Sequence, residues 1–94
     1  MFEVESDGAG TVRLKGRLDA AAASACEEAL KPITQSVTLE CSGLEYISSA
    51  GLAVLLGLYK RLSDKGLALK MVALSARVRN VFTYAGLEKL FSIE

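Results

Sequence analysis

Apolar and polar side chains alternate with a period of two along the first part of the chain. The alternation covers residues 2–6, where Phe2 and Val4 are the apolar positions, and it resumes over residues 12–17. Between these segments lies the turn-forming sequence Asp-Gly-Ala-Gly at residues 7–10. Two alternating segments joined by a glycine-rich turn are typical of a β-hairpin, so the pattern predicts antiparallel strands here.

Helical and strand patterns then follow one another. An alanine-rich helix is expected over residues 20–30, with Asp19 as its N-cap and Pro32 as the break near its end. A short strand is expected at residues 37–41 and should end at Ser42-Gly43, because this pair favours a turn.

A second helical pattern begins at Ser48 and Ser49 and runs to about Lys65, with Gly66 as a natural stop. Its apolar residues recur at helical spacing, which predicts one buried stripe. The stripe comprises Leu52, Leu55, Leu56, Tyr59 and Leu62, widened by Leu58.

The last third of the chain repeats the alternation. Residues 67–72 are largely apolar and predict a strand, and Ser75 is placed to cap a helix that runs through Ala85. Residues 87–93 should then form a short turn and a final strand. The resulting order is β, β, α, β, α, β, α, β, which predicts a single α/β domain over residues 1–94, with a mixed sheet, an opening hairpin and crossover helices.

The two central strands carry a further expectation. Residues 37–41 and 67–72 should be inner, parallel strands covered on both faces, because their apolar runs resemble those of buried parallel strands.

Composition excludes several classes of function. Lys plus Arg and Asp plus Glu each number 11, and a net charge of zero argues against nucleic acid as a partner. No apolar run is long enough to span a membrane, and no signal peptide is visible. We therefore expect a cytoplasmic protein without direct membrane insertion. Cys26 and Cys41 are expected to be buried, reduced thiols, and they lack the spacing of a metal site.

Little supports an enzyme. The chain has no His to act as a general base, no nucleophile elbow, and no glycine-rich phosphate or dinucleotide loop. No catalytic residue and no cofactor are therefore assigned, and a serine hydrolase is disfavoured because nothing would activate Ser49. The one unusual feature is Ser48-Ser49-Ala50-Gly51, which on residue type alone is explained as an ordinary helix N-cap.

Three segments of the chain carry recognisable motifs, namely Leu-Lys-Gly-Arg-Leu-Asp at residues 14–19, the segment 38–52 that contains the serine pair, and residues 69–93. Together they resemble STAS domains, specifically the bacterial anti-sigma-factor antagonists. The first resembles the L-x-G-x-L-D stretch of that family. Residues 38–52 are similar to the central signature, in which a strand leads to an aromatic–aliphatic pair and then to [D/S]-S-[S/T/A]-G-L. Residues 69–93 also fit, with a strand, a Ser-capped helix and Gly-Leu before the last strand. The resemblance covers nearly the whole chain.

The resemblance implies a phosphorylation-switched binding protein in bacterial transcription regulation. The unmodified form would bind an anti-sigma-factor serine kinase of the histidine-kinase-like ATPase fold and free the sigma factor. Phosphorylation would release the complex, and a serine phosphatase would restore binding. By position the implied acceptor is Ser49, with Ser48 as a competing acceptor. Asp19 is expected to order the site or contact the kinase. The implied partner-binding loop comprises Asp19, Ser48, Ala50, Gly51 and Leu52.

The chain departs from the familiar family pattern in a few places. Many members have Asp where this chain has Ser48, and Ser or Thr where it has Ala50. The preceding strand contains Glu40-Cys41 where Asp is frequent. Many relatives also continue into a further helix after the last strand, so part of their partner surface is expected to be absent here.

A second hypothesis belongs to a different class. The same fold serves as an accessory subunit of membrane transporters of the lipid-export type, where it binds an ATPase and no serine is modified. A phosphorylatable Ser49 favours the antagonist.

Overall fold

The chain forms a five-stranded sheet in which the strands lie in their order along the sequence, β1-β2-β3-β4-β5. The structure is a computed structural model that describes all 94 residues. Its elements are β1 (Glu3–Ser6), β2 (Thr11–Leu18), α1 (Ala23–Leu30), β3 (Val37–Ile47), α2 (Ser49–Ser63), β4 (Leu69–Val72), α3 (Ala76–Tyr84) and β5 (Ser92–Ile93). The predicted order of strands and helices is therefore confirmed.

The strand pairing is mixed, as the sequence predicts. β1 and β2 form the antiparallel hairpin, whereas β2–β3, β3–β4 and β4–β5 are parallel pairs. β3 and β4 each have a parallel neighbour on both sides, so the expectation of two inner parallel strands is confirmed. None of the three helices combines the length and the apolar character needed to cross a bilayer.

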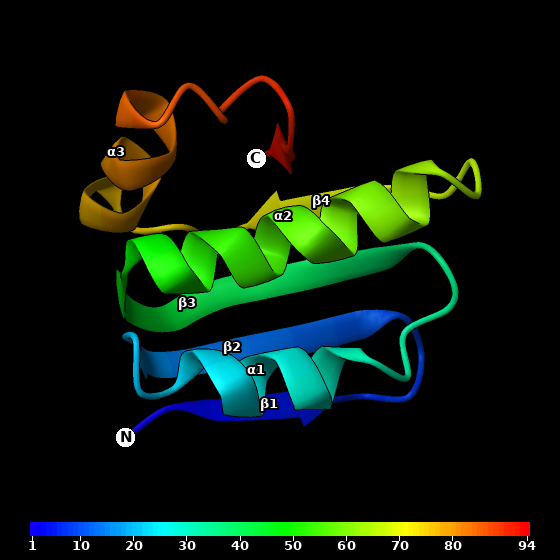
Figure 1. Cartoon of the computed structure of the whole chain (residues 1–94), viewed down its shortest axis with the longest axis horizontal. Helices are drawn as coiled ribbons and strands as arrows, with labels where there is room; N and C mark the ends of the chain where they lie inside the picture. The colour runs from blue at the N-terminus through cyan, green and yellow to red at the C-terminus, as the bar shows by residue number, and fades with distance from the viewer.

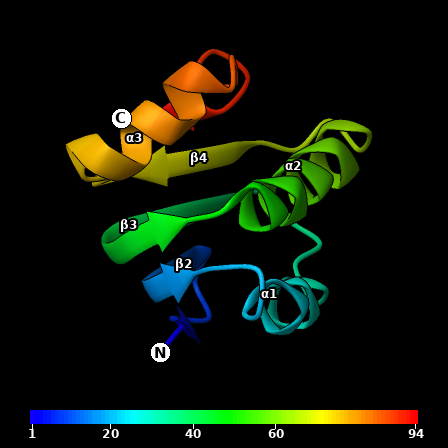
Figure 2. The same ribbon diagram turned by 60° about the vertical axis from the view of Figure 1, so that its left-hand side comes forward.

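The helices gather on one side of the sheet. Each parallel connection moves one strand along in the same direction, and right-handed crossovers then place the connecting helices on the same face. Figures 1 and 2 show α1 and α2 side by side over this face, with α1 near β1 and β2 and with α2 over β3 and β4. α3 follows the end of β4 and packs against β3.

The opposite face of the sheet is open, so the expectation that both faces are covered is wrong. Along β3, the buried Val37, Leu39 and Cys41 alternate with the half-exposed Thr38 and Glu40. β4 follows the same rule, since an exposed lysine separates its two buried residues. Parallel strands with such an alternation bury one face only, and the domain has two layers instead of three.

β3 is longer than expected, because Ser42-Gly43 does not end it. The register between β2 and β3 shifts by one residue at two places, so β3 contains two extra residues relative to its partner. These irregularities move the inward-facing positions from a spacing of two to a spacing of three, and Leu44 and Ile47 remain buried. The strand thereby extends directly to the serine pair.

The three helix starts differ in how well residue type predicts them. Ser75 caps α3 and Ser48 caps α2, each accepting a hydrogen bond from a backbone N–H three residues on. Asp19 is not the N-cap of α1, contrary to expectation. The chain makes a turn first, α1 begins at Ala23, and the N-cap Ala22 offers no side-chain bond.

The core lies between the helices and the covered face of the sheet. On α2 the fully buried leucines are Leu55, Leu58 and Leu62, while the other members of the predicted stripe are half-buried and pack at its margins. Three aromatic rings from different elements close the core near β5. Tyr59 and Phe82 both contact Phe91, with ring centroids 5.5 and 5.4 Å apart respectively.

The two cysteines are buried in this core as free thiols, as the sequence predicts. Burial raises the pKa of Cys26 to about 11 and that of Cys41 to about 12, with a small addition from a neighbouring glutamate in each case. Both thiols are therefore held in the protonated, unreactive form at neutral pH.

Candidate functional site at the start of α2

The ends of β2 and β3 meet at the carboxyl edge of the sheet, and the serine pair follows directly. The backbone N–H of Ser48 donates a hydrogen bond to the carbonyl of Leu18, at 2.9 Å. This bond continues the parallel ladder by one step beyond the end of β3. It brings the residue after Leu18, Asp19, to the same edge of the sheet as the serines.

Ser48 is occupied as the N-cap of α2. Its backbone is extended, with φ −92° and ψ 171°, and its Oγ accepts a hydrogen bond from the N–H of Gly51 at 3.1 Å. Its carbonyl accepts a hydrogen bond from the N–H of Leu52 at 2.9 Å. The Ser48 side chain is half-buried, so its hydroxyl has a structural role in starting the helix.

Ser49 is the first residue of α2, and its side chain is free. The residue is exposed, and its hydroxyl makes no hydrogen bond within the chain. The first turn of α2 carries no acidic side chain, so no carboxylate competes for the partial positive charge of the helix start. Geometry thus separates the two serines into one capping hydroxyl and one available hydroxyl.

Gly51 fixes the distance between the helix start and the sheet. A Cβ at this position would lie 2.6 Å from Leu18 Cγ, 3.0 Å from the Leu18 carbonyl oxygen and 3.1 Å from Ile47 Cγ1. Gly51 is therefore the residue that lets α2 approach the ends of both strands. Its neighbours Ala50 and Leu52 are half-buried, so the whole first turn except Ser49 faces the protein at least in part.

Asp19 lies at the same edge but is directed elsewhere. Its Oδ1 accepts a hydrogen bond from the N–H of Ala22 at 2.9 Å, and it makes no hydrogen bond or ion pair with Ser48 or Ser49. Its carboxylate orders the turn that leads into α1. The structure brings Asp19 near the serines through the strand ends and not through a side-chain contact.

One feature of this edge is not indicated by the sequence motifs, the stacking of Arg17 on Tyr46. These two residues are paired in the β2–β3 register, and the guanidinium carbon lies 4.4 Å from the centroid of the tyrosine ring. Tyr46 is 36% exposed, so an aromatic ring with a cation above it is presented beside the site. The only signal in the sequence is the aromatic residue directly before Ile47, which is also part of the aromatic–aliphatic pair of the motif.

The site offers a hydroxyl and backbone N–H groups, and no base to activate the hydroxyl. The half-buried carboxylate of Asp19 is engaged in its own turn, and no group of three or more acidic or cysteine side chains is placed to hold a metal ion. The arrangement therefore presents one free hydroxyl beside the backbone N–H groups of a helix start.

Comparison with known proteins places this geometry in a family. Over residues 1–92 the chain matches the family described as "Mlab, STAS domain". An anti-sigma factor antagonist from Mycobacterium paratuberculosis has a similar structure, with a TM-score of 0.81 and 25% identity, over 99% of this chain and 83% of that one.

Two structures of SpoIIAA show the same fold. The anti-sigma factor antagonist SpoIIAA in its unphosphorylated form gives a TM-score of 0.79 at 21% identity, covering 100% of this chain and 88% of that one. The phosphorylated form of the Bacillus cell fate determinant SpoIIAA gives 0.68 at 21% identity, covering 100% and 91%. The family match over almost the entire length, supported by these shared folds, shows that the chain belongs to the STAS domain family.

Proposed function

We propose that this protein is an anti-sigma-factor antagonist of the bacterial cytoplasm, and that its binding is switched by phosphorylation of Ser49. The unmodified form binds an anti-sigma-factor serine kinase of the histidine-kinase-like ATPase fold and frees the sigma factor. The kinase phosphorylates Ser49 and the complex dissociates. A serine phosphatase then restores the binding form, and the chain itself catalyses no reaction.

The observation that carries this proposal is the free, exposed hydroxyl of Ser49 at the first position of α2. A kinase must reach the hydroxyl oxygen, and the Ser48 oxygen is partly buried and already accepts from Gly51. Ser49 therefore meets the steric requirement for an acceptor better than Ser48. The structural similarity to anti-sigma factor antagonists, one of them solved in a phosphorylated form, supports the same role.

A phosphate on Ser49 should act on the complex more than on the domain. It adds about −1.5 to −2 charges, which the N–H groups of a helix start accommodate. A partner docked over the same turn must desolvate that charge or meet it with a like charge, which costs several kcal/mol. A cost of about 3 kcal/mol weakens binding roughly a hundredfold, because each 1.4 kcal/mol is a factor of ten.

The test is phosphorylation by the serine kinase of the source cell in the presence of ATP, with the modified residue identified by mass spectrometry. The wild type and Ser48→Ala should both be phosphorylated, on Ser49. Ser49→Ala should bind the kinase yet resist ATP-dependent release, and Ser49→Asp should bind more weakly. Phosphate that disappears in Ser48→Ala but persists in Ser49→Ala would move the acceptor to Ser48.

A second candidate is the accessory subunit of a lipid-export type transporter ATPase. The family match is compatible with this role too, because the STAS fold also serves as an accessory subunit of such transporters. In this role Ser49 is unmodified, and the start of α2 is simply part of a constant interface. Recovery of a transporter ATPase from the source cell, with equal binding by wild type and Ser49→Ala and no kinase that modifies either serine, would replace the first candidate by this one.

A further inference from the structure

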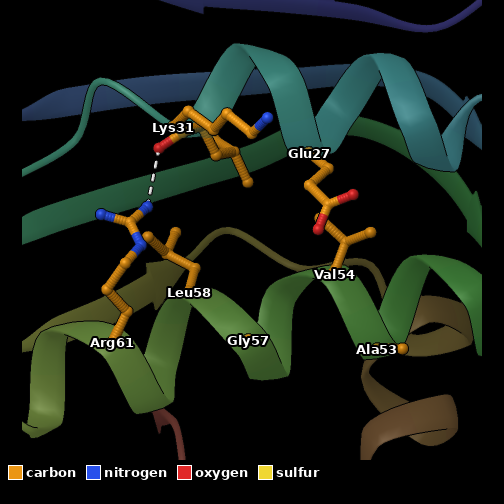
Figure 3. Close-up of a pocket in the computed structure, with 8 residues that line it drawn as sticks. Glu27, Lys31, Ala53, Val54, Gly57, Leu58 and Arg61 are labelled. Carbon is orange, nitrogen blue, oxygen red and sulfur yellow. Dashed lines mark hydrogen bonds between the residues drawn. The ribbon is translucent and has the colours of Figure 1, made fainter.

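A groove runs along the outer surface between α1 and α2, on the side of the helices that faces away from the sheet (Figure 3). Its volume is about 510 Å³, and its floor includes the side chains of Val54 and Leu58. Figure 3 shows Glu27 descending from α1 towards Val54 at one end of the groove, and Lys31 on α1 near the other end. The groove is therefore apolar at its base and oppositely charged at its two ends.

The α2 wall of this groove is low because it is made of small residues. Ala53 and Gly57 are both exposed and lie one turn apart on the same face of the helix. A Cβ on Gly57 would have no atom within 4 Å, so nothing inside the domain requires glycine there. Glycine in a helix interior is less stable than alanine, and the missing side chain leaves the α2 backbone open to close approach from outside.

The charges of the groove are complementary to those of the same groove on a second copy of the chain. Glu27 has no ion-pair partner, and Lys31 contacts only Glu28 of its own helix, at 3.0 Å between exposed groups. A twofold rotation about an axis near Gly57 sets the two α2 helices antiparallel. The Glu27 end of one copy then meets the Lys31 end of the other, and the same pair forms twice.

We propose that this groove is the interface of a homodimer, in which the α2 helices of two copies pack antiparallel across Ala53 and Gly57. Glu27 of each copy pairs with Lys31 of the other. The net charge of zero removes any general repulsion between copies, and only the local charges set the orientation. The proposal is argued from the groove residues and not from the two serines, although Ser49 lies one turn before Ala53 on the same face of α2.

Sedimentation equilibrium between about 10 µM and 1 mM tests the proposal, since this is the range in which weak association is measured. The wild type should show a monomer–dimer equilibrium. Glu27→Lys and Lys31→Glu should each raise the dissociation constant about tenfold or more, because like charges then face each other twice. Gly57→Arg should abolish the dimer while circular dichroism confirms that the helices remain.

The decisive arm is the mixture of the two charge-reversed variants. Neither should dimerise well alone, but together they should form a one-to-one heterodimer, because every facing pair is again opposite in sign. The matched controls are Glu45→Lys and Lys89→Glu, which reverse exposed charges elsewhere and should leave the wild-type equilibrium unchanged. A wild type that stays monomeric throughout, a dimer indifferent to the groove variants, or a mixture that fails to associate overturns the proposal.

Discussion

The same substitution at two glycines of α2 should have opposite effects on stability. Gly51 and Gly57 lie on one helix, but only Gly51 is enclosed by other parts of the chain. Replacement of Gly57 by Ala should stabilise the domain by about 0.5–1 kcal/mol, because the helix gains a better helix former and the new methyl group meets nothing.

Replacement of Gly51 by Ala should destabilise the domain. The new Cβ would lie 2.6 Å from Leu18 Cγ, which is a branch point and not a flexible tip, and 3.0 Å from a backbone oxygen. Overpacking of this kind costs about 1–3 kcal/mol, and the gain in helix propensity offsets at most about 1 kcal/mol. With that offset the net loss reaches about 2 kcal/mol, which lowers the melting temperature of a domain of this size by up to roughly 8–16 °C.

Urea unfolding followed by circular dichroism measures both changes. At a typical slope of about 1–3 kcal/mol per molar urea, a loss of about 2 kcal/mol in Gly51→Ala should lower the midpoint by roughly 0.7–2 M, and Gly57→Ala should raise it. The experiment is done at low micromolar concentration, so that self-association does not contribute. Equal shifts in the same direction for the two variants would show that the close approach of α2 to Leu18 does not limit residue choice at position 51.

Two further predictions concern the serine pair and the thiols. Ser48→Ala should lower the free energy of unfolding by about 1 kcal/mol through loss of the N-cap, whereas Ser49→Ala should change it by less than about 0.5 kcal/mol; a urea titration that gives equal losses would contradict the division of roles. Stability should also fall as the pH rises from about 9 towards 11–12, because the unfolded thiols ionise near 9.0 while burial holds the pKa of Cys26 at about 11 and that of Cys41 at about 12. In this pH range the unfolded chain binds fewer protons than the folded chain. The double variant with Cys26→Ala and Cys41→Ala should therefore show a flatter dependence of unfolding free energy on pH here.

The order of elements was predictable because it rests on local periodicity. Alternation with a period of two marked the hairpin, and the leucines of α2 recur at a helical spacing that no strand would satisfy. Whether helices cover one face of the sheet or both was not predictable in the same way. The apolar run at residues 67–72 resembled a strand buried on both faces, yet only Leu69 and Met71 point into the core, and Lys70 between them is exposed.

The length of β3 depends on long-range pairing. Ser42-Gly43 has a strong local preference for a turn, but Gly43 is held opposite Lys15 of β2 within the parallel ladder. Pairing with the long β2 overrides the turn propensity and absorbs the extra residues as register shifts. No property of the segment by itself indicates that its partner will be long enough to do so.

The site was only partly predictable, because residue type indicates some of its roles and backbone geometry decides the others. A serine before a helix is recognised as a cap by residue type, which placed the helix start correctly at the pair. Which of the two serines caps depends on backbone dihedrals, and Ser48 is extended whereas Ser49 is already helical. The assignment of Asp19 failed because its carboxylate does bond to an N–H three residues on, but in a turn that ends before α1 begins.

The groove between α1 and α2 could not have been found from the sequence, because tertiary contacts create it. Arg61 near the end of α2 donates to the carbonyl oxygens of Leu30, at 3.0 Å, and of Ile33, beyond the end of α1. These bonds join residues about thirty positions apart and hold the two helices in register. Gly57 gave a weak signal, a glycine inside a strong helical pattern, but only the open space around it distinguishes this position from Gly51.

If Ser49 is phosphorylated as proposed, the separation of the serine roles explains how this helix start stays rigid while it is modified. Gly51 presses the first turn against the strand ends, and Ser48 satisfies the Gly51 N–H with its own oxygen. The neighbouring hydroxyl of Ser49 is therefore not needed for the fold, and the remaining free N–H groups of the turn can face a charge placed on it. If the capping serine were also the acceptor, each modification would disturb the hydrogen bond that starts the helix, and binding and folding would change together. With the two roles on adjacent residues, a phosphate on Ser49 would alter the surface that a partner meets and would leave the cap in place.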